Sequence, residues 1–121
     1  MARTDGFIKT YNAGAAIAPN TLVKFGASDN VVIPAAAATD DIIGVTVDGV
    51  AAAINERVDV VLSSGVANVK IAGVIARGKG VTSNATGQGV IGATGNRIVG
   101  YADISGVAGD IIPVIIHVGT L

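Results

Sequence analysis

Two glycine-rich stretches come closest to a site for chemistry, and each lacks something that the chemistry requires. Residues 73–80 read Gly-Val-Ile-Ala-Arg-Gly-Lys-Gly, which is close to a phosphate-binding P-loop. That loop needs a serine or threonine after the lysine to hold Mg²⁺, and a helix behind it. Gly80 stands in the place of the hydroxyl residue, and no helix is predicted after it. We therefore predict a turn between strands rather than a phosphate site.

Residues 87–92 read Gly-Gln-Gly-Val-Ile-Gly and match the dinucleotide-binding fingerprint by letter. The fingerprint has physical meaning only between a strand and a helix, because the helix N-terminus holds the pyrophosphate. Polar residues precede this stretch, and residues 93–96 (Ala-Thr-Gly-Asn) follow it, so no helix is predicted there. No nucleotide cofactor is expected.

The remaining reactive residues are isolated. His117 is the only histidine, so a multi-histidine metal site is excluded. The adjacent acids Asp40 and Asp41 are expected to cap the alanine run at 35–38, because a sugar site would need aromatic side chains that this chain lacks. The glycosylation pattern at 84–86 follows no secretory signal and predicts a polar loop. We predict no catalytic, cofactor-binding or metal residue, and no enzyme.

The composition favours a protein that hides part of its surface. The chain has 121 residues, enough for one domain with a core, and 50% of them are hydrophobic but only 3% aromatic. Charged residues make up 14%, against roughly 25% in an average soluble domain. A surface so short of charge predicts a homo-oligomer or an assembly component.

Charge and hydropathy also exclude several partners. The formal net charge is −1 and the eight Lys and Arg residues are scattered, so no nucleic-acid-binding footprint is present. No stretch has the length and apolarity of a membrane-spanning helix, and cysteine is absent. We expect neither nucleic acid nor membrane as a partner.

Seventeen glycines between short Val/Ile runs indicate an all-β domain. Strands are predicted over residues 6–11, 21–25, 31–33, 42–47, 57–62, 66–71, 98–102 and 111–118. Residues 57–71 are expected to form a β-hairpin, and residues 35–38 and 51–55 at most one helical turn each. Pro113 lacks a backbone donor, which predicts an edge strand or a bulge there.

The chain also contains an internal duplication. Residues 42–50 (Ile-Ile-Gly-Val-Thr-Val-Asp-Gly-Val) resemble residues 98–107, and each block is followed by a strand, at 56–62 and 110–116. The predicted fold is a compact small β-barrel or sandwich with an internal pseudo-twofold repeat, the copies spanning about 17–71 and 75–121.

Strand alternation assigns faces in both copies. The residues predicted to face the core are Val58, Val60 and Leu62 in the first copy and Ile112, Val114 and Ile116 in the second. Val61 and Ile115 fall on the opposite face in matching positions. Matched apolar residues on that face predict a second buried surface, for which we expect a subunit contact.

Residues 1–16 are predicted to form an extended N-terminal arm ahead of a β-domain at 17–121. Arg3, Phe7, Lys9 and Tyr11 give this segment two cations and half of the aromatic residues. Such an arm can add a strand to a neighbour's sheet edge, so these four residues are predicted partner contacts. The alternatives are a first strand of the domain itself or a frayed end.

Several short segments together carry a resemblance to a known family. They are Ile17-Ala-Pro-Asn-Thr-Leu-Val-Lys, Ile43-Gly-Val, Asp48-Gly-Val, Glu56-Arg-Val-Asp-Val, Gly78-Lys-Gly and Ile98-Val-Gly-Tyr-Ala. Their order resembles the head-decoration, or capsid cement, proteins of tailed phages. The resemblance implies a compact β-domain on the outer surface of an icosahedral shell, often a trimer, with an N-terminal arm that pairs with the major capsid protein. It also implies a virion location and no catalytic motif, and leaves a dimeric, jelly-roll-like branch open.

The sequence therefore predicts a structural protein that decorates and stabilises a phage head through many weak contacts. The main alternative is a carbohydrate- or receptor-binding β-module of a phage fibre or baseplate, against which the scarce aromatics count. A small nucleotide-binding enzyme and a subunit of a non-viral shell or filament are further alternatives.

Overall fold

The computed structural model describes residues 7–49, 51–62 and 64–121, and this part of the chain forms ten β-strands and no helix. The first five strands are β1 (Ile8–Ala13), β2 (Leu22–Phe25), β3 (Val31–Pro34), β4 (Ile42–Thr46) and β5 (Arg57–Val61). The other five are β6 (Val66–Lys70), β7 (Gly80–Ser83), β8 (Gly89–Ile91), β9 (Arg97–Ala102) and β10 (Ile111–Thr120). The all-β prediction is confirmed. Residues 35–38 and 51–55, expected to form at most one helical turn each, form none: they are irregular or turn apart from a bridge at Ala52, because one turn does not repay helix nucleation.

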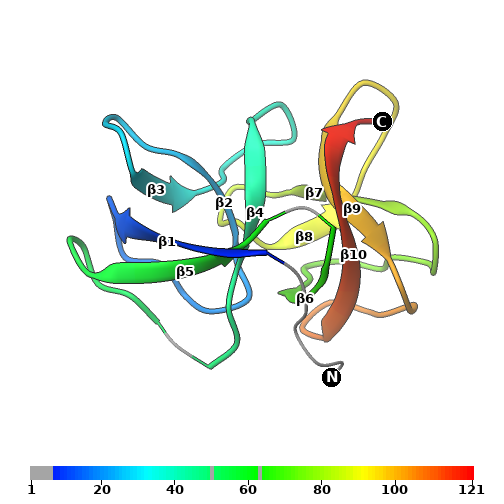
Figure 1. The fold of residues 1–121 in the computed structure, drawn as a ribbon. Helices are drawn as coiled ribbons and strands as arrows, with labels where there is room; N and C mark the ends of the chain where they lie inside the picture. Colours follow the sequence, from blue (N-terminus) through cyan, green and yellow to red (C-terminus); the bar gives the residue numbers. More distant parts are fainter. Residues whose placement is uncertain (1–6, 50, 63) are drawn as a thin grey trace.

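The strands form two adjacent units, which Figure 1 shows side by side. Strands β1–β5, the first unit, close into a barrel in the order β1-β3-β2-β4-β5. Strands β6–β10, the second unit, form a five-stranded sheet in the order β6-β10-β9-β7-β8. When β6 to β10 are matched in chain order with β1 to β5, each strand has the same neighbours in both units. The duplication in the sequence is therefore a duplication of the fold.

The two units differ in how they close. In the first unit β1 pairs in parallel with β3, through Asn12–Val31 and Ala13–Val32. In the second unit a single parallel bridge, Ile71 to Gly89, occupies the corresponding place. Each unit begins with its own first strand, β1 or β6, so both start earlier in the chain than the sequence repeats at 17 and 75 suggested.

Matching hydrogen bonds show that the connections before β5 and β10 are built alike. The N–H of Asn55 donates to the carbonyl of Ala13 at 2.7 Å, and that of Gly109 donates to Ile71 at 2.8 Å. Both donors have a positive φ, 69° at Asn55 and 92° at Gly109. Asparagine and glycine are the residues that tolerate this left-handed conformation best, so each copy has a residue suited to the same turn geometry.

Two hydrophobic clusters hold the molecule together. One fills the barrel, and its buried members are Tyr11, Ala13, Ile17, Val23, Val32, Ala52, Val58 and Val60. The other joins the units. From the first unit it takes Leu22, Ala35, Ile42, Val45 and Val61, and from the second ten residues that include Val69, Val99, Ile112, Val114 and Ile116. Strand β4 contacts β6, β9 and β10, so the outside of the barrel packs on the second sheet. The inward faces predicted for residues 58–62 and 112–116 are confirmed.

A buried polar network also links the units. The side-chain amide of Asn20 donates to the carbonyl of Asn68 at 2.9 Å and to the carboxylate of Asp48. Asn68 in turn donates from Nδ2 to Asp48 Oδ2 at 3.0 Å. Asn68 alternates with the core residues Ala67 and Val69 along β6, and it is nevertheless buried, because the first unit covers this part of the strand.

Two further expectations about pairing are wrong. Residues 57–71 form no hairpin, because β5 pairs with β1 and β4 while β6 pairs with β10 in the other unit. Pro113 does not mark an edge, since β10 lies between β6 and β9. Pairing with β9 begins only at Val114, so the missing N–H of Pro113 lies at the end of that ladder. The bulge in β10 falls instead between Ile116 and Gly119.

Candidate interaction surface

The first nucleotide-like stretch leads into a β-hairpin, and the second contains one of its strands. Gly80 begins β7 and Gly89 begins β8, and the two strands pair through Val81–Ile91. A Cβ at Gly89 would lie 2.9 Å from the side chain of Val81 and 3.0 Å from that of Val69. Glycine is therefore required here by close packing in the core, which explains the letters of the fingerprint without a phosphate.

Asp40 of the acid pair caps the alanine segment, as expected. Asp40 Oδ2 accepts hydrogen bonds from the N–H groups of Ala36 at 2.8 Å and Ala37 at 3.0 Å, and it pairs with Lys24 Nζ at 2.9 Å. The Ala36 N–H, and then Lys24, hold the pKa of Asp40 below its ordinary value. Asp41 lies 3.5 Å from Arg97 Nε and is largely exposed. These contacts stabilise the fold and leave no converging carboxylate pair.

Within residues 7–49, 51–62 and 64–121, no cluster of three or more His, Asp or Glu side chains could hold a metal ion. In that same part of the chain no helix has the length and apolarity needed to cross a membrane.

The predicted arm residues have different surroundings. Arg3 lies outside the described residues. Phe7 is 71% exposed, and Lys9 Nζ lies 4.6 Å from the centre of the Tyr11 ring. Over residues 8–13 the chain takes the alternative of a first strand, because β1 pairs with β3 and β5 inside the barrel. Tyr11 is 5% exposed and packs in the barrel core, so its ring is not available to a partner.

The prediction that Val61 contacts another subunit is wrong. Val61 does lie opposite Val58 and Val60 and is fully buried, but the second unit of the same chain covers it. The second buried face is confirmed at Val61, whereas its counterpart Ile115 is 46% exposed. Strand alternation does not show which surface covers that face.

Val61 belongs to a line of apolar residues that crosses the outside of the first unit. Ile8 pairs with Val61, Val61 with Val45, and Val45 with Leu22. We call Val61, Val45 and Leu22 the covered row, since all three have no exposed surface.

The same line crosses the second unit. Val66 pairs with Ile115, Ile115 with Tyr101, and Tyr101 with Gly80. We call Val66, Ile115 and Tyr101 the open row, because Ile115 is 46% exposed and its two neighbours are partly exposed. Ile115 is thus the structural counterpart of Val61, on a face that stays about half exposed among residues 7–49, 51–62 and 64–121.

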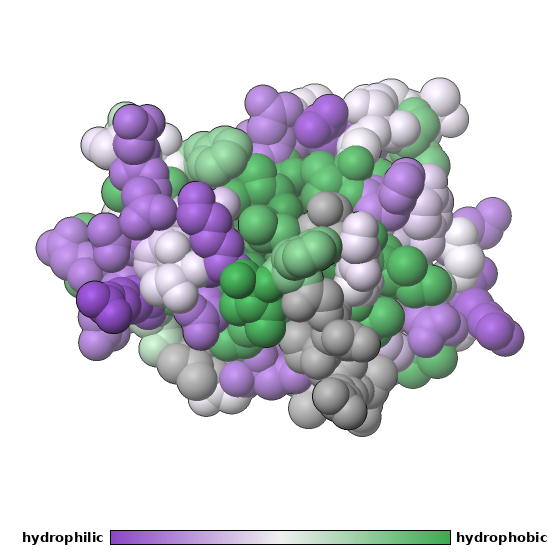
Figure 2. Space-filling model, in the orientation of Figure 1, coloured by the Kyte–Doolittle hydropathy of each residue, from purple (hydrophilic) through white to green (hydrophobic). Residues whose placement is uncertain are grey.

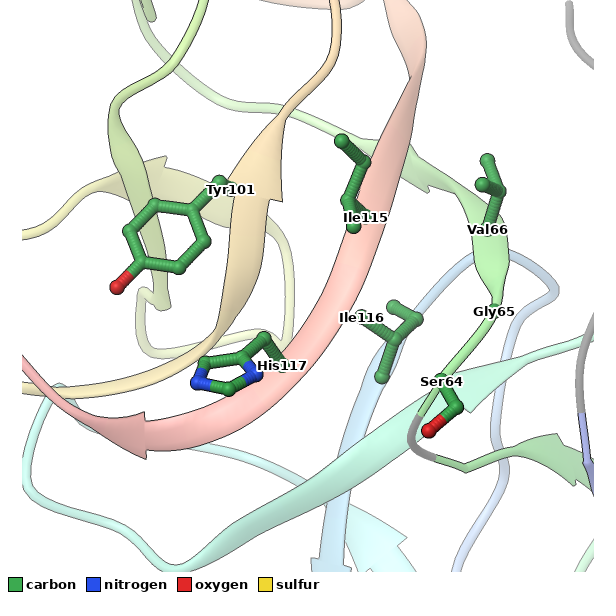
Figure 3. A pocket seen from close by; sticks show the side chains of 7 residues that line it. All are labelled: Ser64, Gly65, Val66, Tyr101, Ile115, Ile116 and His117. Carbon is green, nitrogen blue, oxygen red and sulfur yellow. The ribbon is translucent and has the colours of Figure 1, made fainter.

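The open row lines a groove of about 590 Å³, drawn in Figure 3. Its lining residues are Ser64, Gly65, Val66, Tyr101, Ile115, Ile116 and His117. The Tyr101 and His117 rings lie side by side with their centres 6.1 Å apart. None of the lining residues is an Asp, Glu, Lys or Arg. The groove offers apolar surface with a phenol and an imidazole at its margin, which suits contact with another protein surface.

Sequence reasoning found Ile115 and placed His117 correctly outside the core. It missed Tyr101 and Val66, although the pattern Ile-Val-Gly-Tyr in the second copy, where the first has Ile-Ile-Gly-Val, contained the signal. A large amphipathic side chain in one copy, where the other has a core valine, marks a face whose surroundings differ.

The comparisons with known proteins concern the fold. No protein-family model and no curated protein sequence matches this chain. Among solved structures, the chain is similar to the head fiber gp8.5 N base of bacteriophage phi29. The likeness has a TM-score of 0.70 with 18% sequence identity, and it covers 95% of this chain and 97% of that one. The arrangement of ten strands in two units is therefore a fold shared with that phage head protein.

Proposed function

We propose that this protein is a non-enzymatic structural subunit of a phage virion, which binds the outer surface of the head and stabilises the shell. The observation that carries the proposal is the likeness in fold, over nearly the whole of both chains, to the base of a phage head fibre. The resemblance of its sequence to head-decoration proteins supports the same reading.

The exposed apolar side chains fit a subunit that is packed between other proteins of an assembly. Figure 2 shows apolar side chains gathered over the middle of one face, while polar ones crowd its left end. Exposed apolar side chains include Phe7 at 71% and Ile8 at 51%, next to each other at the start of the barrel. A surface of this kind loses unfavourable contact with water when it is covered.

The proposed mechanism is multivalent binding. Each subunit contacts the major capsid protein through residues that include Arg3, Phe7 and Lys9, and it contacts neighbouring copies through Ile115. A homo-oligomer, with a trimer favoured and a dimer as the alternative, engages several lattice sites at once. Weak single contacts then combine into high avidity, because the later contacts are intramolecular.

A second candidate is the base of a head fibre, which would carry a receptor- or carbohydrate-binding part on the virion. The name of the similar structure favours it specifically. The two candidates differ in copy number, since a decoration protein occupies every equivalent lattice site and a fibre base occupies fewer.

The test is binding to isolated expanded phage heads, followed by sedimentation and counting of copies per head. We expect saturable binding that Phe7→Ser and Lys9→Glu weaken by about tenfold each. Ile54→Ser is the matched control, because Ile54 is 60% exposed and lies in the connection before β5. A low and fixed copy number would favour the fibre base. Absence of binding to any head would remove the proposed function.

A further inference from the structure

We propose that the groove on the second unit is the binding site for a second copy of this chain, which covers the open row. This rests on the proposed function only in so far as that function calls for an oligomer. It assigns the contact to a named surface, Val66, Tyr101, Ile115 and His117, which the fold itself singles out.

The covered row and the open row occupy equivalent positions in the two units. Gly44 on β4 lies so close to β5 that a Cβ there would collide with the carbonyl oxygen of Val61. Gly100 on β9 stands in the same relation to Ile115 on β10. Two strand pairs with the same close approach present Val61 and Ile115 on the same face of their units. One of these faces is covered by a unit of this fold, and the other remains partly exposed in the part of the chain that the structure describes.

The groove adjoins the interface between the units. Ile116 lines the groove and is also a buried member of the cluster that joins the two units. The groove thus borders a contact that already holds one such unit against another. A further copy seated there would cover apolar surface next to an existing core.

The groove is lined by uncharged residues. Identical surfaces that meet bring their charges together, so a charged patch opposes self-association. The seven lining residues include no Asp, Glu, Lys or Arg. The chain as a whole has 14% charged residues, so the groove is part of a surface that carries little repulsion toward its own copy.

The internal contact cannot simply be repeated between chains. The covered row packs on the inner face of the second sheet, and the corresponding inner face of the first unit is filled by its own cluster around Tyr11, Val58 and Val60. The second copy must therefore contribute outer surface, and a closed symmetric arrangement lets each groove be covered once.

The test is the molar mass of the purified full chain by sedimentation equilibrium over a range of concentrations, with three variants. Ile115→Asp places a charge in the groove and is expected to weaken association at least 100-fold. Tyr101→Ser removes the ring that flanks Ile115 and is expected to weaken it about tenfold. Ile104→Asp is the matched control: Ile104 is also 46% exposed in the second unit, but it lies outside the groove and should leave the mass unchanged.

Each outcome either supports or overturns the proposal that a second copy covers the groove. A dimer or trimer that Ile115→Asp alone converts to a folded monomer, with an unchanged denaturation midpoint at low concentration, supports the proposal. A wild-type monomer, or equal effects of Ile115→Asp and Ile104→Asp, overturns it. A further outcome is that Tyr101 reacts freely with iodine in the free chain and becomes protected only when the chain is bound to heads. That result would assign the groove to a contact with the shell and would also overturn the proposal. A groove-dependent oligomer that binds no head keeps this inference and removes only the proposed function.

Discussion

The two units of this protein share a strand order and the positions of their turns, yet their outer faces have different surroundings. In the first unit, Val61 and its row are buried under the second unit. In the second unit, the counterpart Ile115 is 46% exposed and lines a groove. Backbone pairing therefore fixes which side chains share a face, while the surroundings of that face depend on what packs against it.

The units differ in their polar turns as well. Asp40 caps the turn before β4 and pairs with Lys24. In the second unit Asn96 accepts a hydrogen bond from the N–H of Ala93 at 2.8 Å, in the corresponding turn before β9. One unit uses a charge where the other uses a neutral amide, so only the first makes this turn sensitive to acid.

The largest expected effect comes from the close approach that both units share. Gly44→Ala and Gly100→Ala each force a methyl group against a carbonyl oxygen of the neighbouring strand. We expect each to lower the free energy of unfolding by about 3 kcal/mol or more, because overpacking of a fixed backbone must displace a strand. Chemical denaturation measures this.

Gly73→Ala is the control for both, since a Cβ there meets nothing within 4 Å and its φ is not positive. It should change stability by less than about 0.5 kcal/mol. A mild effect at Gly100 alone would mean that β9 and β10 are not held as closely as β4 and β5.

The next effect separates the covered row from the open row. Val61→Ala removes two buried methyl groups and should cost about 2 kcal/mol, from lost burial and the cavity left behind. Ile115→Ala removes more side chain but starts half exposed, so at concentrations where the chain is dissociated it should cost less than about 1 kcal/mol. Equal costs would contradict the assignment of the two faces.

A smaller effect tests the matched turns. Glu56 Oε1 accepts from the N–H of Ala53 at 2.6 Å, and Asp110 Oδ2 accepts from that of Val107 at 2.9 Å. Both carboxylates are exposed, so Glu56→Ala and Asp110→Ala should each destabilise by about 0.5–1 kcal/mol. Thermal unfolding of the two variants side by side should show similar shifts. A shift in only one would show that the two connections are not energetically alike.

The smallest effect is a pH dependence in the first unit. The pKa of Asp40 is lowered in the folded state, first by the Ala36 N–H and then by Lys24. A lowered pKa means that its stabilisation is fully present above the unfolded pKa of about 3.9 and is lost as the pH falls through the folded value. Asp40→Asn should therefore be less stable than wild type at pH 7, and the gap should shrink as the pH falls below about 4. Urea midpoints from pH 7 to pH 2 measure the gap, and a constant gap would contradict the assignment.

Much of the fold followed from side-chain alternation and repetition. Val58, Val60, Ile112 and Val114 lie on the buried faces that alternation predicts, because one side of each strand must pack on a core. The hairpin at 57–71 failed for a physical reason. A short polar link between two strands looks the same whether the strands pair or pass to different sheets, and only the partners available to β5 decide which occurs.

The candidate surface was only half predictable. Ile115 is apolar on an outward face, and that much can be deduced from the strand pattern. Strands β7 and β8 were missed because their glycines, required for close packing at Gly89, look like loop residues in a sequence. The open row lies on three strands that were predicted, β6, β10 and β9, but the sequence does not show that Val66 and Tyr101 pair with Ile115, so the row across the sheet exists only in three dimensions.

The most direct test is an electron cryo-microscopy reconstruction of phage heads incubated with the purified chain, at a resolution that shows side chains. We expect regularly placed copies on the outer surface, with Tyr101 and Ile115 of each copy buried against a neighbouring copy and Val61 buried within its own chain. Copies whose Tyr101 and Ile115 face solvent, or heads without bound copies at saturating concentration, would contradict this expectation.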